Sequence, residues 1–236
     1  MMHTLVLFDI DGTLLNSSSA GRRAIQRAFA AEFADLAFFT SVRFDGKTDP
    51  QIVAELYAAA GQPERATPER TAQLLDSYVD HLAAEVGRAD HRVRALPGVA
   101  PLLDALHATA GVCVGLLTGN IVGGARLKLG AAGLPFERFR LGAFGSDSSR
   151  RPDLPAIAAE RAMPIFGRVP RGAEVVIIGD TPADVTCGEG IGARAVAVAT
   201  GAYDGATLSA AGAAAVFDDL SATDDVLEAI LCSNSN

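Results

Sequence analysis

The sequence predicts an α/β protein with a doubly wound parallel sheet, interrupted near its start by a block of helices. Apolar runs of strand length alternate with helical patterns over residues 92 to 236, which is typical of a parallel sheet with helices on both faces. Residues 16 to 91 carry helical patterns only. We therefore expect a core built from residues 1–15 and 92–236, with an inserted all-helical domain at 16–91.

The first part of the chain is expected to contain one strand and three helices. Thr4 to Phe8 is a short apolar run and reads as a buried strand. Ile25, Phe29 and Phe33 recur every fourth residue, as on one face of a helix. The helices are expected at 21–33, around 49–60 and at 68–86.

Beyond residue 92 the two patterns alternate. Strands are expected at 112–117, 139–145 (weak), 174–180 and 193–200. Helices are expected at 99–109, 121–132, 153–163, from 181 onward, 205–212 and 223–231, with an apolar segment at 214–219. This alternation predicts βαβ units and hence a parallel sheet.

Composition excludes several classes of protein. The net charge is −8 and no run of Lys and Arg occurs, so we expect no nucleic-acid partner. Cys113, Cys187 and Cys232 are far apart, which indicates reduced thiols and not a metal site. The start lacks the basic region of a signal peptide and no run of residues resembles a membrane helix. We expect a cytoplasmic protein without a membrane partner.

Polar and acidic side chains follow three of the expected strands. Asp9 and Asp11 follow the first, Thr118, Gly119 and Asn120 end the second, and Asp180 ends the third. The carboxyl ends of parallel strands share one crevice. Carboxylates gathered there repel one another unless a cation offsets their charge, and oxygen ligands suit Mg²⁺, which commonly accompanies a substrate phosphate. The pattern predicts a Mg²⁺ site for a phosphorylated substrate.

Three motifs carry a resemblance to a known family. "DIDGT" (9–13), "LLTGN" (116–120) and "GDTPADV" (179–185) occur in this order. Together they resemble the haloacid dehalogenase superfamily, and within it the phosphoglycolate phosphatase-like branch, over nearly the whole chain. The resemblance implies a Rossmann-like core, with the helical insertion at the place of a type 1 cap.

The resemblance also implies a role for each motif residue. Asp9 would be the nucleophile that forms an aspartyl-phosphate. Asp11 would exchange protons with the leaving alcohol and the water, with a pKa near the working pH. Thr118 would bind a phosphoryl oxygen, helped by the backbone N–H groups of Gly119 and Asn120.

The metal ligands implied are Asp9, the backbone carbonyl of Asp11, and Asp180, with Asp184 holding or orienting a metal-bound water. Asp184 has a second interpretation. Thr181 and Pro182 form a helix start in which Asp184 would complete a capping box. Both interpretations stay open, and they are compatible.

The chain departs from the family pattern at one position. Relatives carry a lysine before the last acidic motif, whereas here Arg151 precedes Pro152 and no lysine occurs after residue 128. A guanidinium can supply the same positive charge, so the role passes to Arg151. Alternatively, Arg150 and Arg151 are solvated loop residues. Lys128 is a weaker substitute that could equally lie on the surface.

The segment "FDGKTDPQI" (44–52) resembles the loop of relatives that closes over the site. Lys47 and Arg43 are then candidates for binding substrate. The alternative is a connecting loop in which Thr48 or Asp49 caps the next helix.

The function expected is that of a Mg²⁺-dependent phosphatase acting on a small, phosphoglycolate-like phosphorylated metabolite. The alternatives are a phosphomutase resembling β-phosphoglucomutase, a haloacid dehalogenase, and a non-catalytic binding protein on the same scaffold. A dehalogenase needs no Mg²⁺ and no carboxylate at position 11, so Asp11 and Asp180 argue for a phosphate substrate. The oligomeric state, monomer or homodimer, stays open.

Overall fold

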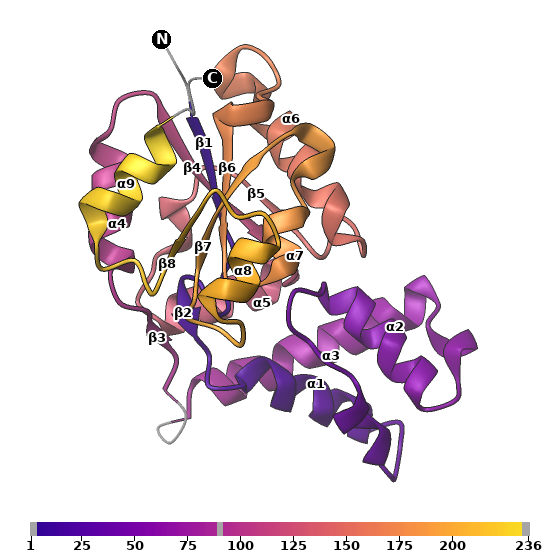
Figure 1. The fold of residues 1–236 in the computed structure, drawn as a ribbon. Coiled ribbons are helices and arrows are strands. Elements are labelled where there is room, and N and C mark those ends of the chain that lie inside the picture. The colour runs from indigo at the N-terminus through magenta and orange to yellow at the C-terminus, as the bar shows by residue number, and fades with distance from the viewer. Residues whose placement is uncertain (1–3, 89–91, 233–236) are drawn as a thin grey trace.

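The computed structural model describes residues 4–88 and 92–232, and a six-stranded parallel sheet forms its centre (Figure 1). The strand order is β5-β4-β1-β6-β7-β8. The strands are β1 (Thr4–Phe8), β4 (Val112–Thr118), β5 (Gly142–Phe144), β6 (Val175–Gly179), β7 (Arg194–Val198) and β8 (Ala215–Phe217). The predicted α/β class and parallel sheet are confirmed.

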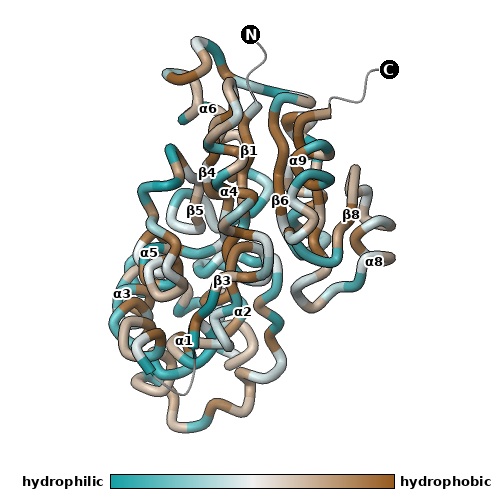
Figure 2. The backbone as a smooth tube through the Cα atoms, turned by 90° about the vertical axis from the view of Figure 1, so that its left-hand side faces the viewer, coloured by the Kyte–Doolittle hydropathy of each residue, from teal (hydrophilic) through white to brown (hydrophobic). Residues whose placement is uncertain are grey.

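The middle strand, β1, is buried on both faces, which explains its uninterrupted apolar run. Val6 and Phe8 belong to one hydrophobic cluster, and Leu5 and Leu7 to another on the opposite face. The first face is covered by α4 (Val99–Ala108), α5 (Val122–Ala131) and α9 (Thr223–Leu231). The second is covered by α6 (Leu154–Phe166), α7 (Pro182–Thr186) and α8 (Gly205–Ala210). The brown tube of the central strands in Figure 2 follows this core.

Three helices form a separate layer at the end of the sheet to which β1 leads (Figure 1). They are α1 (Ala20–Ala30), α2 (Asp49–Ala59) and α3 (Pro68–Val86). Their apolar faces pack into a cluster of their own, in which the Phe29 ring packs against the tilted Tyr57 ring with centroids 5.0 Å apart. We refer to these helices and their loops as the cap. Its expected limits, 16 and 91, remain a prediction, and the second limit falls at residues 89–91, outside the described part of the chain.

A short antiparallel ribbon joins the cap to the core. β2 (Leu15–Asn16) pairs with β3 (Arg94–Ala95), so the strands that enter and leave the cap lie side by side. Ser18 and Ser19 follow with positive φ angles of 50° and 61°, a backbone region that side chains other than glycine occupy at a cost. The sequence did not indicate this ribbon, because two-residue strands have no periodicity to read.

Several element limits differ from those expected. The strand expected at 139–145 is reduced to β5, and a 3-10 turn at Phe136–Arg138 lies before it. The segment at 214–219 contains the edge strand β8, and the helix expected at 153–163 continues to Phe166. Every helix in the described part of the chain is too short or too polar to cross a bilayer.

Candidate active site

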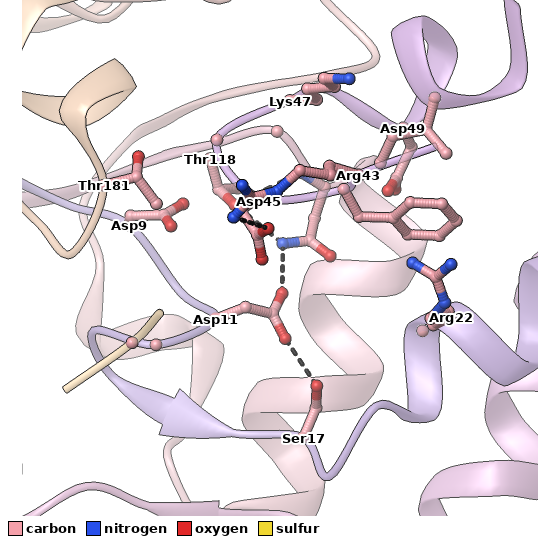
Figure 3. A pocket seen from close by; sticks show the side chains of 18 of the residues that line it. Asp9, Asp11, Ser17, Arg22, Arg43, Asp45, Lys47, Asp49, Thr118 and Thr181 are labelled. Carbon is pink, nitrogen blue, oxygen red and sulfur yellow. Dashed lines mark hydrogen bonds and ion pairs between the residues drawn. The ribbon is translucent and has the colours of Figure 1, made fainter. Parts of the chain in front are cut away.

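A cavity of about 640 Å³ lies between the carboxyl ends of the strands and the cap (Figure 3). Its charged side chains come from both parts: acidic and basic ones from the core, and three basic and two acidic ones from the cap. The residues that matter below are, from the core, Asp9, Asp11, Thr118, Gly119, Asn120, Lys128, Arg151 and Asp180, and, from the cap, Arg22, Arg43, Lys47, Asp49 and Tyr78.

The turn after β1 places Asp9 and Asp11. The Asp9 N–H donates to the Ile178 carbonyl of β6 at 2.9 Å, which extends the parallel ladder by one residue. Gly12 has a φ of 82°, and a Cβ there would lie 2.3 Å from Asp180 Oδ2. Only glycine therefore allows this turn to approach Asp180, and the "DIDGT" pattern follows from that approach.

Three buried carboxylates form the acidic cluster of the site. Oxygens of Asp9, Asp180 and Asp184 all lie within 4.8 Å of one another. Burial raises the pKa of Asp9 to about 6, against the attraction of Arg151. Burial, together with the charges of Asp184 and Asp9, also raises the pKa of Asp180 well above its ordinary value. The cluster therefore holds more negative charge than its surroundings compensate.

Arg151 is the cation that faces this cluster. Its Nη2 lies 3.2 Å from Asp9 Oδ1 and also pairs with Asp184 Oδ1. The alternative that Arg151 is a solvated loop residue is wrong, because its side chain is 5% exposed, although Arg150 is exposed. One guanidinium against three carboxylates leaves a deficit of positive charge that suits a divalent cation. The donor set of carboxylate oxygens fits Mg²⁺.

Asp184 has the capping geometry that the sequence suggested. Its Oδ2 accepts from the Thr181 N–H at 3.0 Å and from Thr181 Oγ1 at 2.7 Å, and the Asp184 N–H donates to Thr181 Oγ1. Its other oxygen faces Arg151. The capping interpretation is thus confirmed, while a metal role for Asp184 remains a proposal.

Asp11 is held by three donors. Ser17 Oγ donates at 2.7 Å, Asn120 Nδ2 at 2.9 Å and Lys128 Nζ at 2.6 Å; Figure 3 shows the bond to Ser17. Burial by itself would raise the pKa of Asp11, but the charge of Lys128 and these hydrogen bonds hold that pKa below its ordinary value. These contacts favour the charged form of Asp11, and its expected role in proton transfer remains a proposal.

Lys128 is buried and not on the surface. It is 5% exposed, and its Nζ also donates to Asn120 Oδ1 at 2.6 Å. It pairs with Asp11, whereas Arg151 pairs with Asp9. The surface alternative is wrong, and sequence reasoning undervalued this residue. Its spacing of three residues from the buried Ala125 is a signal that could have placed it on the inner face of α5.

Thr118 and Asn120 lie at the end of β4. Thr118 is fully buried, and its Oγ1 accepts from Asn120 Nδ2 at 2.8 Å. Gly119 lies against the cap: its carbonyl accepts the Asp49 N–H at 2.8 Å. A Cβ at Gly119 would come within 2.0 Å of the Lys47 carbonyl, so glycine is required for this approach.

The segment 44–52 docks on the core through two polar residues. Thr48 accepts from the Gln51 N–H at the start of α2 and donates to the Ser149 carbonyl at 2.7 Å. The N-cap alternative is thus confirmed for Thr48. Asp49 caps a different element, since its Oδ2 accepts the Ile121 N–H at the start of α5 at 2.8 Å. Burial raises the pKa of Asp49 to about 6, despite Lys128 and this hydrogen bond.

Arg43 and Lys47, the expected substrate contacts, both line the cavity. The Arg43 side chain is 69% exposed and lies 3.4 Å from Asp45, with its guanidinium over the Tyr203 ring. Lys47 pairs with Glu55. Their position permits contact with a ligand, and their role remains a proposal.

The parallel sheet brings an aspartate pair, a second acidic motif and a buried arginine to one crevice at the carboxyl ends of its strands, where α/β enzymes bind their ligands. The chain belongs to the haloacid dehalogenase-like hydrolase family, since the sequence model of that family matches residues 3–192.

Curated relatives place it more narrowly. It is 29% identical over 234 residues to a phosphoglycolate phosphatase of Rhodospirillum rubrum. The alignment covers 96% of this chain and 91% of the relative. It is 30% identical over 193 residues to a phosphoglycolate phosphatase of Cereibacter sphaeroides, covering 80% and 82% of the two chains. The family and these relatives make the chain a phosphatase.

Solved structures share the fold. A hydrolase from Pseudomonas syringae superposes with a TM-score of 0.72 at 25% identity, covering 98% of this chain and 100% of that one. CbbY from Rhodobacter sphaeroides, solved in complex with phosphate, gives a TM-score of 0.69 at 22% identity over 93% and 96% of the chains.

Proposed function

We propose that this phosphatase hydrolyses a small, phosphoglycolate-like metabolite with the help of Mg²⁺, through an aspartyl-phosphate on Asp9. The observation that carries the proposal is the position of Asp9: it belongs to the acidic cluster, pairs with Arg151 and lines a cavity of metabolite size. The names of the curated relatives support the substrate class.

The acidic cluster fits the proposed metal. Asp9, Asp180 and the backbone carbonyl of Asp11 would hold Mg²⁺, and Asp184 would hold or orient a water bound to it. Burial and mutual repulsion raise the pKa values of Asp9 and Asp180, and a bound cation would favour the charged forms of both. When bound, the metal supplies positive charge to the acidic cluster and to the phosphoryl group.

The side chains of the protein divide the remaining work. Asp9 attacks phosphorus, and Arg151 orients its carboxylate and stabilises the charge that develops. Thr118 donates its hydroxyl to a phosphoryl oxygen, together with the N–H groups of Gly119 and Asn120 near the start of α5. Asp11 protonates the leaving alcohol and later takes a proton from water.

The contacts of Asp11 set a condition on that last role. Three donors hold its carboxylate in the charged form, so substrate binding must loosen at least one of them before Asp11 carries a proton. The docked loop at 44–52 meanwhile covers the site, which keeps bulk water from the intermediate.

The experiment is an assay of phosphate release from 2-phosphoglycolate and a panel of small phosphate esters, with Mg²⁺. We expect Asp9→Asn to lower the rate at least about a thousandfold with an unchanged circular dichroism spectrum. Retained activity in this variant would refute the nucleophile assignment. Turnover of a sugar bisphosphate without net phosphate release would instead favour the phosphomutase.

The metal is tested without turnover. Mg²⁺ added after EDTA treatment should raise the melting temperature, because an ion that binds only the folded state stabilises it. Asp180→Asn should abolish most of that rise. An equal rise in the variant would show that the ion binds elsewhere.

A further inference from the structure

Beyond Asp11, the cavity extends to a group of hydrogen-bond donors contributed by three elements. Lys128 of α5, Tyr78 of α3 and Gly21 of α1 all line it. They lie close together: a Cβ built on Gly21 would stand 3.1 Å from Lys128 Nζ and 3.6 Å from the Tyr78 hydroxyl oxygen. None of the roles assigned above uses Tyr78 or Gly21.

The first turn of α1 presents unsatisfied backbone donors here. The helix spans 11 residues, its N-cap residue Ser19 makes no side-chain capping hydrogen bond, and its first turn contains no acidic residue. Ala20 and Arg23 donate to Ser17 and Ser19, but in the described part of the chain the Gly21 N–H has no acceptor. A helix N-terminus in this state carries a partial positive charge and favours an anion.

Tyr78 supplies the independent observation that points to a ligand. The residue is 0% exposed, yet its hydroxyl forms no hydrogen bond with any described residue and faces the cavity. A buried tyrosine hydroxyl normally has a partner. A hydroxyl without a protein partner at the wall of a cavity is available to a ligand atom.

Lys128 has a donor to spare. An ammonium group has three N–H donors, and Asp11 and Asn120 account for two of them. The remaining donor is available on the side of Gly21 and Tyr78.

Charge favours an anion at this end of the cavity despite two nearby carboxylates. Asp11 is balanced by Lys128, and Asp49 accepts the Ile121 N–H. Arg22, the residue after Gly21, also lines the cavity (Figure 3). Its guanidinium donates to the carbonyls of Phe39 and Val42, and no carboxylate of the described residues pairs with it. The charge of Arg22 and the helix end are therefore left over for a ligand.

We propose that Lys128, the Tyr78 hydroxyl and the N-terminus of α1 form a second anion subsite that selects substrates with a negative group on the leaving alcohol. The inference rests on the proposed function and deepens it. Lys128 also contacts Asp11, which in the proposed function protonates the leaving oxygen. The negative group must therefore lie only a few bonds from that oxygen. A carboxylate and a second phosphate share the required chemistry.

The test measures binding and not turnover. The Asp9→Asn variant with Mg²⁺ is titrated calorimetrically with three ligands: 2-phosphoglycolate, ethane-1,2-diol bisphosphate, and ethyl phosphate, which lacks the second anion. We expect at least one of the first two to bind about tenfold more tightly than ethyl phosphate, as for a hydrogen bond to a charged group. If 2-phosphoglycolate binds more tightly than ethyl phosphate, the subsite takes a carboxylate; if the bisphosphate does, the subsite takes a phosphate.

Adding Tyr78→Phe should remove most of that preference and leave ethyl phosphate unaffected. Tyr57→Phe is the matched control, since Tyr57 is equally buried in the cap but donates to Glu32 at 2.9 Å; it should keep the preference. If Tyr78→Phe does not fold, Lys128→Met replaces it, and loss of the preference is again expected.

Three results would overturn the subsite: equal affinity for all three ligands, no binding of any of them, or an equal loss for all three in Tyr78→Phe. Since the titrated protein lacks the nucleophile, a failure of the proposed phosphatase mechanism appears in the phosphate-release assay and leaves this comparison readable.

Discussion

Replacing Asp49 with asparagine tests whether the docked cap loop carries a buried charge. The Asp49 side chain is buried and accepts the Ile121 N–H at 2.8 Å, a bond that an asparagine oxygen can also accept. The substitution therefore removes the charge while it keeps the shape and the hydrogen bond.

The magnitude follows from the pKa of Asp49, which burial raises from its ordinary 3.8 to about 6. Between these values the folded protein binds more protons than the unfolded one, so this carboxylate lowers the stability as the pH rises. A shift of this size costs about 3 kcal/mol at high pH. About 2 kcal/mol of it develops between about pH 4.5 and about pH 8. Relative to the parent protein, Asp49→Asn should gain that amount over this interval.

The assay is urea unfolding of parent and variant at both pH values. Other titrating groups are shared by the two proteins and cancel in the difference. Asp45→Asn, an exposed carboxylate of the same loop, is the control and should change little. A difference between Asp49→Asn and the parent that is flat with pH, or that falls as the pH rises, would refute the reasoning.

Three further predictions concern the site and its supporting helix. Gly119→Ala should lower kcat/KM at least about tenfold with little change in melting temperature. The reason is that the added Cβ would stand 2.0 Å from the Lys47 carbonyl and prevent docking of the loop at 44–52. Unchanged kinetics would show that docking of this loop is dispensable. Gly130→Ala, in α5 and with open space around the added Cβ, should stabilise the protein by about 0.5–1 kcal/mol in urea unfolding, and a loss would contradict the helical assignment. Arg151→Met should destabilise by about 3–5 kcal/mol without metal, since it leaves Asp9 and Asp184 without their cation. Mg²⁺ should restore part of that loss, and equal stability of variant and parent in EDTA would refute the pairing.

Local patterns were sufficient for the sheet and for most of the acidic motifs. β1 is buried on both faces, so its sequence had to be continuously apolar, and the polar residues that follow it had to lie at the strand end. The helix start at Thr181 could also be predicted from the sequence, because a capping box involves two residues that are three positions apart.

Contacts between distant parts of the chain could not be predicted from the sequence. Lys128 and Asp11 are separated by 117 positions, and Asp49 and Ile121 by 72. A helical pattern shows which residues share a face but not what that face meets. The sequence did not predict the short strands β2, β3 and β8 for a related reason: they are defined by their pairing with other strands and not by periodicity.

The sequence by itself thus determined the α/β core, the helical insertion, and the three motifs that deliver Asp9, Thr118 and Asp180 to one crevice, because buried strands and helix caps leave a local pattern. Only the tertiary structure decided that Arg151 faces Asp9, that Lys128 holds Asp11, and that the cap loop docks through Asp49. Those outcomes depend on how the cap lies against the core. Burial then turns ordinary surface residue types into strongly interacting charges, because water no longer screens them.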